Sequence, residues 1–474
     1  MCRTLTAPRL KHMESIHLAG VCSPWPGYPV AVSAGGFCFL SSLMGLNDDG
    51  ELLSDWNDLP GEKRPFDSGF MLVDAQAAPV TAQSWLLYRH TRAVMASRGG
   101  DLTDMLRSHI YQKDKAYWPV YEQVRMAYEP DAPAPSSGVG VSAGSPDGNA
   151  WITQDGIALD PQNWPYPGGR RVPQSEGARP VTSFYSQVVE AGPYLFVAGQ
   201  IPIDTAKPGN PLIRSFEDVP EEGRFLQVGR SHTDTDNGPI AAQTWFVYDN
   251  IRRILEGVGS AMEEIVSVTV FLQDMRDFGV FHAMHERFFT GALPALTVTA
   301  FREVGHKPGT RLEIEVTAMR GDQAFDRTTI SAAGDRVSGA HAALAVKAGP
   351  LLFFSGVAGI SAQGRAVTDV DGLTQPLQRQ AAELARSTQR PVATVQAMKI
   401  FEDLQAIAYE TGASLENIAK VTLYLEDFAD FRAFDAVCRH FLPAERPALS
   451  CVAIPRASPV PGAALCVEAI GVIE

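Results

Sequence analysis

An internal repeat is the feature that most constrains how this 474-residue chain can fold. The segment Val80-Thr-Ala-Gln-Ser-Trp85 returns as Ile240-Ala-Ala-Gln-Thr-Trp245, and Val268-Thr-Val-Phe-Leu-Gln-Asp274 returns as Val421-Thr-Leu-Tyr-Leu-Glu-Asp427. The length supports the same interpretation, because the chain is too long for one ordinary core and corresponds to about three domains of about 150 residues. The sequence therefore predicts three copies of one small domain.

Each copy shows the same order of predicted elements. Apolar residues between Val247 and Val258 recur with the period of an amphipathic helix, and the β-branched and aromatic residues of Val268–Asp274 predict a strand. A glycine turn that leads into an earlier strand occurs at residues 190–199 and 347–356, with a divergent counterpart at 33–42. The order strand, strand, helix, strand, helix, strand, strand predicts an α+β sandwich with helices on one face of a mixed sheet.

The copies differ after their second strand. Copies one and two carry long insertions there, residues 47–79 and 204–239, which are rich in Asp, Gly and Pro. Loops of this length inside a domain are commonly lids or binding loops, with disorder as the alternative. Copy three has instead a long helical region, residues 375–409, interrupted near Pro391. The predicted domains span residues 1–165, 166–327 and 328–474.

Charge and hydropathy exclude several kinds of partner. The chain has 40 Lys and Arg against 54 Asp and Glu, a formal net charge of −14, and no basic run, so we expect no binding to nucleic acid or to anionic membranes. No apolar stretch reaches the 18 to 20 residues or so that a membrane helix needs, because the most apolar one, residues 348–360, contains glycines and a proline. The expected partner is a small-molecule substrate.

Cysteine usage and the first residues bear on the compartment. The six cysteines include no Cys-x-x-Cys pair, which favours reduced thiols over a disulfide framework or a zinc cluster. Arg3, Arg9 and Lys11 are not followed by a continuous apolar segment, so a signal peptide is not predicted. We therefore expect a cytoplasmic protein that uses neither a metal nor an organic cofactor.

Copy two carries a family resemblance. Its run Gly192-Pro-Tyr-Leu-Phe-Val-Ala-Gly-Gln-Ile-Pro202 resembles the signature segment of the RidA/YjgF family of reactive-intermediate deaminases, and residues 267–278 and 311–318 are similar to the central and last strands of that family. The resemblance covers nearly the whole chain and is closest in copies two and three. It implies three tandem RidA-like (chorismate mutase-like) α/β sandwich domains. Because the family forms homotrimers with ligand sites between subunits, it also implies an intramolecular pseudo-trimer.

The resemblance implies a reaction as well. Family members hydrolyse imines and enamines to ketones and ammonia, using an arginine to hold the substrate carboxylate and a glutamate with an ordered water. The arginine is matched here by Pro135, Leu296 and Leu449, none of which can replace a guanidinium. We expect an imine or enamine deaminase or a related C–N hydrolase. A chorismate-type lyase or tautomerase and a non-catalytic ligand-binding or scaffold protein remain as alternatives.

The candidate catalytic residues are Glu313, His282 and Tyr185. The resemblance matches Glu313 to the family's glutamate, and Cys466 takes that place in copy three. A carboxylate that faces a closed cleft can have its pKa raised towards neutrality and can then move a proton. His282 shares a helix face with His285, a spacing that can chelate a metal, but no further ligand is visible.

The expected substrate contacts come from positions matched between copies. The family's pocket tyrosine is matched by Tyr28, Tyr185 and Ala342, its pocket serine by Ser41, Ala198 and Ser355, and a polar helix position by Tyr121, His282 and Asp435. A basic patch before the last strand of copy two can replace the missing arginine or be a solvated loop; it contains Arg302, His306, Lys307 and Arg311. The expected substrate-binding residues are Tyr28, Ser41, Tyr121, Gly199, Ser355 and Cys451.

Overall fold

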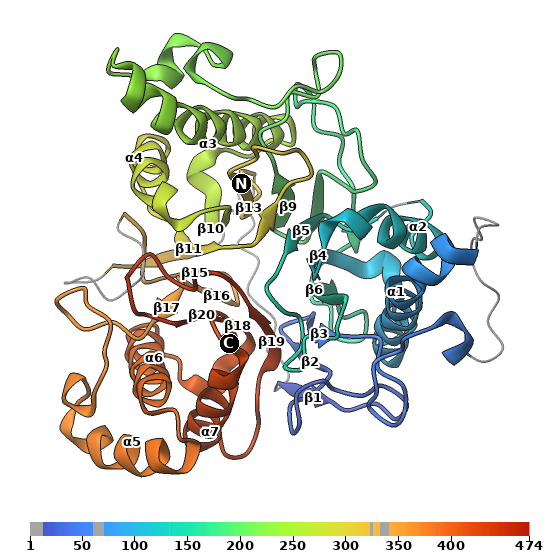
Figure 1. The fold of residues 1–474 in the computed structure, drawn as a ribbon, viewed down its shortest axis with the longest axis vertical. Coiled ribbons are helices and arrows are strands. Elements are labelled where there is room, and N and C mark those ends of the chain that lie inside the picture. The colour runs from blue at the N-terminus through green and yellow to red at the C-terminus, as the bar shows by residue number, and fades with distance from the viewer. Residues whose placement is uncertain (1–12, 60–70, 132, 323–325, 332–340, 474) are drawn as a thin grey trace.

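Three sheets of similar layout surround a common centre, and each carries helices on its outer face (Figure 1). The structure, a computed structural model, describes residues 13–59, 71–131, 133–322, 326–331 and 341–473. Cys2, the basic residues Arg3, Arg9 and Lys11, part of the first insertion, and residues 323–325 and 332–340 near the predicted boundary between copies two and three therefore lie outside the described residues. Three mixed sheets with covering helices confirm the prediction of three tandem α+β domains.

Copy one forms a seven-stranded sheet in the order β1-β2-β3-β6-β4-β5-β12. Its last strand, β12 (Glu303–Val304), belongs to copy two and pairs with β5, so the two copies share an edge. The remaining elements are β1 (Glu14–Ile16), β2 (Ala31–Ala34), β3 (Phe37–Leu43), α1 (Met71–Ser97), β4 (Met105–Gln112), α2 (Trp118–Tyr128), β5 (Ser136–Gly140) and β6 (Ile152–Leu159).

Copy two forms a six-stranded sheet in the order β11-β10-β13-β9-β8-β7. The pair β10 and β11 is parallel and the other pairs are antiparallel, which makes the sheet mixed as predicted. Its elements are β7 (Arg170–Arg171), β8 (Val188–Ala191), β9 (Tyr194–Gln200), α3 (Ser231–Gly257), β10 (Ile265–Leu272), α4 (Phe278–Phe288), β11 (Ala295–Ala300) and β13 (Leu312–Met319).

Copy three repeats this layout in the order β14-β15-β16-β20-β18-β19, with β17 also paired to β20. Its helical region is divided into two helices, and the second begins at Pro391, a residue that is well tolerated in a first helical turn. Its elements are β14 (Arg327–Ile330), β15 (Ala345–Ala348), β16 (Leu351–Phe354), β17 (Val357–Ala358), α5 (Gln375–Thr388), α6 (Pro391–Glu410), β18 (Ile418–Leu425), α7 (Phe431–Phe441), β19 (Ala448–Ala453) and β20 (Leu465–Val472).

The long helices of copies one and two begin earlier than the sequence predicted. Helix α1 starts at Met71 and α3 at Ser231, so both start inside the expected insertions, and Pro79 and Pro239 lie within them. A proline removes only one hydrogen bond from the helix, and packing of the flanking turns can outweigh that loss. The insertions are therefore shorter as loops than their composition suggested.

The repeated glutamine of each copy fastens the long helix to the sheet. The Gln243 amide nitrogen donates to the carbonyls of Ile213 and Gly309, and its amide oxygen accepts from the backbone N–H of Arg311. Gln83 and Gln396 make equivalent bonds in the other copies. All three side chains are buried, so each needs its full set of partners. The repeat seen in the sequence thus marks a structural contact.

Side chains from all three copies meet at the centre of the molecule in layers along the strands. One apolar layer contains Phe39, Phe196 and Phe353. A second apolar layer contains an aromatic residue from β4, β10 and β18. The second layer is formed around Tyr111, Phe271 and Tyr424.

A polar layer lies between these two apolar layers. Each copy supplies one buried carboxylate from its last strand, because Asp155, Glu315 and Glu468 occupy equivalent register positions. Arg107 of copy one reaches Glu315 of copy two at 3.6 Å, and Lys420 of copy three reaches Asp155 of copy one at 3.3 Å.

Copy two breaks the symmetry of the polar layer. Ser267 occupies the position equivalent to Arg107 and Lys420, so copy two supplies no basic residue there. His109 bridges Asp155 and Glu315 at 2.7 and 2.8 Å, and these two carboxylates raise its pKa to about 10 against the opposing effect of burial. The copies therefore meet through three different sets of polar contacts.

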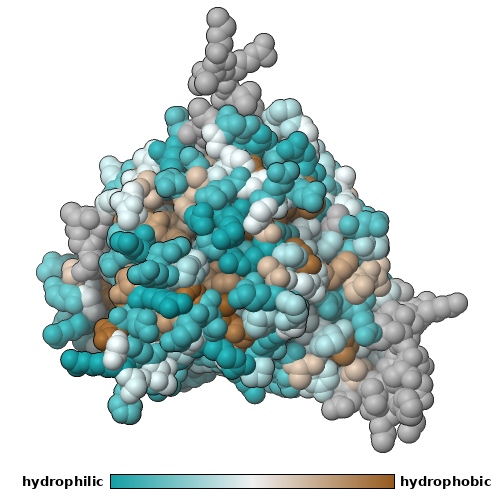
Figure 2. Space-filling view, turned by 90° about the horizontal axis from the view of Figure 1, so that it is seen from above, coloured by the Kyte–Doolittle hydropathy of each residue, from teal (hydrophilic) through white to brown (hydrophobic). Residues whose placement is uncertain are grey.

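The outer surface is mainly polar where it is seen from above. On that face hydrophobic residues form small patches separated by hydrophilic ones (Figure 2). Among the described residues, no helix combines the length and the apolar character that a membrane span requires.

Candidate functional site

A cavity of about 110 Å³ opens between copies one and two. This volume accommodates several water molecules and therefore a small ligand. Three of the residues predicted from the sequence line it, namely Tyr185, Gly199 and Glu313 of copy two. The opposite wall comes from copy one and includes Lys115, Ser136 and Gly138.

Glu313 is the acidic group at the base of this cavity. It lies on β13 opposite Phe271, and its residue surface is only 4% exposed. Burial raises its pKa to about 7, and nearby Glu315 acts in the same direction. Lys115 and backbone hydrogen bonds from Gly138 and Gly305 oppose that rise. A carboxyl group with such a pKa exchanges a proton readily near neutral pH.

Gly199 leaves room for this carboxylate. A Cβ atom at position 199 would lie 2.0 Å from Glu313 Oε1 and 2.6 Å from Ser137 Oγ, both shorter than any van der Waals contact. A larger residue would displace the carboxylate from its place. The contribution of Gly199 to the site is thus steric.

Tyr185 borders the same carboxylate. Its side chain is half-buried, and burial together with Glu313 raises its pKa to about 12. The phenol therefore stays protonated at physiological pH and acts as a hydrogen-bond donor. Tyr185, Gly199 and Glu313, which the sequence analysis grouped in copy two, line the same cavity. Gly199 and Glu313 lie on the paired strands β9 and β13, and Tyr185 lies three residues before β8.

Lys115 supplies a cation from the other copy, and the sequence analysis did not single it out. It starts the short 3-10 helix Lys115–Tyr117, its ammonium donates to the Gly138 carbonyl at 2.5 Å, and it lies 5.3 Å from the centroid of the Trp118 ring. Burial lowers its pKa, while Glu313 and Glu303 act in the opposite direction. Among the described residues only one of its three N–H donors has a partner, so the others remain available to a ligand.

Ser136 occupies the register position that the sequence analysis assigned to Pro135. It pairs with Ser108 of β4, just as Leu296 pairs with Val268 of β10 and Leu449 with Val421 of β18. The matched residue of copy one is therefore Ser136, one position later; the segments from the end of α2 to Ser136 and from the end of α4 to Leu296 have the same length, so the sequence match itself was out of step by one residue. The buried guanidinium of Arg125 donates to the Ser136 hydroxyl at 2.9 Å, which leaves that hydroxyl proton available to the cavity.

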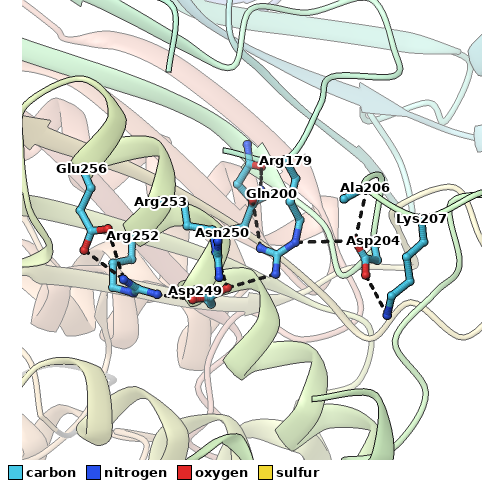
Figure 3. A network of polar contacts seen from close by, with 10 residues as sticks. All are labelled: Arg179, Gln200, Asp204, Ala206, Lys207, Asp249, Asn250, Arg252, Arg253 and Glu256. Atoms are coloured by element: carbon cyan, nitrogen blue, oxygen red, sulfur yellow. Dashed lines mark hydrogen bonds and ion pairs between the residues drawn. The ribbon is translucent and has the colours of Figure 1, made fainter. Parts of the chain in front are cut away.

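A polar network forms the outer part of the copy-two wall (Figure 3). Arg179 donates to Asp249 at 3.0 Å and to Asn250 at 3.2 Å, and its guanidinium lies 3.9 Å from the centroid of the Phe246 ring. The Asn250 amide continues the network to Gln200 at 2.7 Å. Arg179 and Asn250 line the cavity, and neither was predicted from the sequence.

The equivalent cleft between copies one and three is filled. Trp25 is 1% exposed, donates its indole N–H to Ser42, and packs against Phe428 and Phe431 at ring distances of 6.1 and 4.9 Å. Tyr28 is buried beside it under the guanidinium of Arg446, 4.9 Å from its ring centroid.

Cys451 lies on the copy-three side of this closed cleft. It is fully buried in the same apolar cluster as Trp25, and burial raises its thiol pKa well above the ordinary value. Tyr28 and Cys451 were expected to contact substrate, but the structure places both inside packed protein, because an indole occupies the space.

Ser41 and Ser355 serve the contacts between copies. The Ser41 hydroxyl donates to the Pro29 carbonyl at 2.6 Å and accepts from the backbone N–H of Leu449 at 2.9 Å. Ser355 makes the same pair of bonds to Ala343 and Leu296. Both hydroxyls are fully buried and satisfied by protein groups, so the structure does not present these predicted ligand contacts to a cavity.

Tyr121 lies in the core of copy one. It is fully buried, its hydroxyl is 3.0 Å from that of Tyr88, and it donates to Gln154 at 2.9 Å. Counted from the starts of α2 and α4, Tyr121 corresponds to Phe281, and Glu122 corresponds to His282. The sequence match was therefore one residue out of step on this helix.

His282 is not part of the cleft that contains Glu313. Glu122, its counterpart in copy one, accepts a hydrogen bond from Ser183 of copy two, so this helix position faces the neighbouring copy. His282 itself lies between Phe278 and Glu286, and Glu286 also approaches His341 of copy three at 4.0 Å. Each copy borders two clefts, and the sequence alone did not separate them.

Residues of the basic patch predicted before the last strand have different surroundings in the structure. His306 lines the cavity, and burial together with Lys115 and Lys307 lowers its pKa. Arg311 instead pairs with Asp277 through two 2.8 Å hydrogen bonds. Within the described ranges no group of three or more His, Cys, Asp or Glu residues is arranged to hold a metal ion.

A family model and a curated relative both match parts of this chain. A family model described as "Endoribonuclease L-PSP" matches residues 225–320 and 336–473, within copies two and three. A RutC family protein of Pyrococcus horikoshii is 33% identical over 137 residues, which cover 29% of this chain and 86% of that protein.

Two further comparisons also match about one copy. A 2-iminobutanoate/2-iminopropanoate deaminase of Escherichia coli is 29% identical over 147 residues, 31% of this chain and 94% of that protein. The crystal structure of RidA from an Antarctic Psychrobacter bacterium is 23% identical, with a TM-score of 0.24 over 31% of this chain and 98% of that one.

Proposed function

Since this chain belongs to the RidA/YjgF family, which the Endoribonuclease L-PSP model describes, we propose that it is a deaminase-type hydrolase of small imines or enamines that carry a carboxylate. The proposed active site is the cavity between copies one and two. The observation that carries the proposal is the position of Glu313, whose pKa burial raises to about 7, beside the ammonium of Lys115 in one desolvated cavity.

Glu313 is the proposed proton carrier. Its carboxylate takes a proton from a water molecule as the water oxygen bonds to the imine carbon. Glu313 passes that proton to the nitrogen, which gives a carbinolamine. It then carries the remaining proton from the carbinolamine hydroxyl to the nitrogen as the C–N bond breaks, which releases ammonia and leaves a ketone. Tyr185 donates a hydrogen bond to the polar intermediate, since its phenol remains protonated.

Lys115 is proposed to take over the role of the family's arginine. The three register positions matched to that arginine hold Ser136, Leu296 and Leu449, so the substrate carboxylate needs another partner. Lys115 enters the same cavity from the same copy as Ser136, and its unused N–H donors can bind a carboxylate as a point charge. Ser136 adds a hydroxyl donor.

The three copies are proposed to act as a single-chain counterpart of the family's trimer. The shared apolar layers, the polar layer between them and the strand exchange of β12 support this arrangement. We propose a cytoplasmic location, which is supported by five described cysteines that form no disulfide with one another. A small metabolite fits the cavity and the net charge of −14 better than RNA does.

The test is imine hydrolysis by the full chain. An amino-acid oxidase generates 2-imino acids in the presence of the protein, and the acceleration of ammonia release is measured. Glu313→Gln is expected to lower turnover by roughly 100-fold or more. Cys466→Ser, at the same register position in copy three, is the matched control and is expected to retain wild-type turnover. Wild-type turnover by a folded Glu313→Gln protein would remove Glu313 from the mechanism.

A further inference from the structure

The candidate cavity contains cations on both of its walls. Lys115 comes from copy one and lies beside Glu313, whereas Arg179 comes from copy two and lies beside Asn250 and Gln200 (Figure 3). The proposed reaction uses only the first of these cations. Arg179 therefore requires a separate explanation.

Arg179 is held in place but is not fully used by its protein partners. Its Nη1 and Nη2 atoms each make one hydrogen bond, and its Nε lies 3.8 Å from Asp204, too far for a hydrogen bond. Two of its five N–H donors are thus engaged within the described part of the chain. Phe246 covers one face of the guanidinium, but the N–H donors lie in its plane, so this contact does not block them.

Positive charge exceeds negative charge around this arginine. Asp249 is shared by three guanidinium groups, since Arg252 and Arg253 approach it at 2.5 and 2.8 Å in addition to Arg179. Asp204 is likewise divided between Arg179 and Lys207, which lies 3.1 Å from it. Arg252 also pairs with Glu256 at 3.0 Å, so four cations in this network face three carboxylates, and the network retains a net attraction for an anion.

This arrangement occurs in the copy that also carries the acid. At the positions of Asp249, Asn250 and Gln200, copy one has Arg89, His90 and Leu43, and copy three has Glu402, Asp403 and Val357. The residue of copy one that corresponds to Arg179 is Cys22. The basic wall therefore accompanies Glu313 and is not a general feature of the repeat.

We propose, on the basis of the proposed function, that the substrate carries two carboxylates, one bound by Lys115 beside the reacting centre and the other by Arg179. The natural substrate class is then a dicarboxylic 2-imino acid, and the product is the corresponding dicarboxylic 2-oxo acid. Burial lowers the pKa values of Lys115, Arg179 and His306 alike, and the carboxylates that lie near these cations do not offset this effect. Two substrate carboxylates would add negative charge beside them.

The test compares product analogues by isothermal titration calorimetry with the full chain. 2-Oxoglutarate, a dicarboxylate, is expected to bind at least about 10-fold more tightly than 2-oxobutanoate, a monocarboxylate, because one additional charge-assisted contact forms. Arg179→Gln is expected to remove that preference and to change the affinity for 2-oxobutanoate by less than about 2-fold. Arg179→Lys, which keeps the charge, is expected to retain part of the preference.

Arg253→Gln is the matched control. Arg253 binds the same Asp249 carboxylate as Arg179 but does not line the cavity, so its loss tests whether loosening the network alone alters binding. This variant is expected to retain the preference for 2-oxoglutarate. Equal affinities for the two acids, binding of neither, or an equal loss of preference in Arg253→Gln would overturn the inference. Failure of the proposed function is a different result, namely no acceleration of imine hydrolysis.

Discussion

The open cleft between copies one and two and the closed cleft between copies one and three are built from equivalent strands. In the closed cleft Trp25 fills the space and the Ser41 hydroxyl ties the copies together through Leu449. In the open cleft the corresponding residues of copy two are Thr182 and Ala198, which are smaller and lack that tie.

The two clefts also differ at the position of the candidate acid. Glu313 of the open cleft corresponds to Thr153 in the closed one, as both face the aromatic residue of the neighbouring strand at the same register position. A few side chains on an unchanged backbone thus decide whether an interface between copies contains a site or a core. The four predictions below separate these two outcomes.

The largest effect is expected at Glu315, which lies two residues after Glu313 but in the central polar layer. Glu315→Gln leaves Arg107 without a charged partner and His109 with Asp155 alone, and is expected to cost about 3–5 kcal/mol of unfolding free energy, measured by denaturant titration. Glu313→Gln, which borders the open cavity, is expected to change stability far less.

A pH series provides a second check on Glu315. Its pKa is lowered to about 2 by Arg107 and His109 against the effect of burial, so its stabilising contribution is present above the pKa of the unfolded chain. That contribution is lost as the pH falls from about 4.5 towards 2. The unfolding free energy of Glu315→Gln should vary less with pH over this range than that of the wild type. An equal variation in both proteins would show that Glu315 is not its source.

Trp25→Ala is expected to empty the closed cleft. Removing a buried indole costs roughly 3 kcal/mol of unfolding free energy and leaves a cavity against Phe428 and Phe431. Imine hydrolysis is expected to stay at the wild-type rate, because Thr153 offers no carboxylate to the new space. Additional turnover by this variant would mean that space alone limits the closed cleft.

Thr182→Trp is the reverse experiment. An indole at this position is expected to fill the open cleft as Trp25 fills the closed one, and to lower turnover by roughly 100-fold with little loss of stability, since Thr182 is exposed. Thr182→Ser, which keeps the side chain small, is the control and should be as active as the wild type. An active Thr182→Trp protein would place the reaction elsewhere.

The smallest expected effect is the pH dependence of kcat/KM. Glu313 must be ionised to accept a proton, and its pKa is raised to about 7, so kcat/KM should fall about tenfold for each pH unit well below 7 and level off above it. The remaining activity of Glu313→Gln should lack this step. A profile with its midpoint near the ordinary glutamate value would show that the acid is solvated in the working protein.

The sequence predicted the fold and part of the site for reasons that these residues make clear. The assignment of Glu313 followed from the family resemblance, and the strand register places Gly199 and Glu313 beside each other on β9 and β13. Lys115 stands where copies two and three have Met275 and Phe428, so matching the copies does not mark it, and it reaches the site from a different copy. Arg179 lies in the segment before β8, outside the repeated strands. Only the packing of the copies reveals such residues.

Three positions were misassigned. His282 was assigned to the cleft of Glu313 because one copy was treated as one site, whereas opposite edges of a copy face different neighbours. Ser136 was missed by one position because the sequence match in front of β5 was out of step by one residue, and strand pairing resolves the shift. Tyr121 likewise fell one residue out of step on its helix.

The serine at position 267 has a consequence for the history of the protein. A ring of three units like copy two would enclose three carboxylates equivalent to Glu315 with no basic residue at that level, whereas copies one and three each bring their own arginine or lysine. Burying three such carboxylates without a counter-charge is costly, which disfavours assembly of this copy with itself. Separation of the chain into independent copies would leave copy two in need of Arg107 from copy one, so Ser267 opposes a reversal of the fusion.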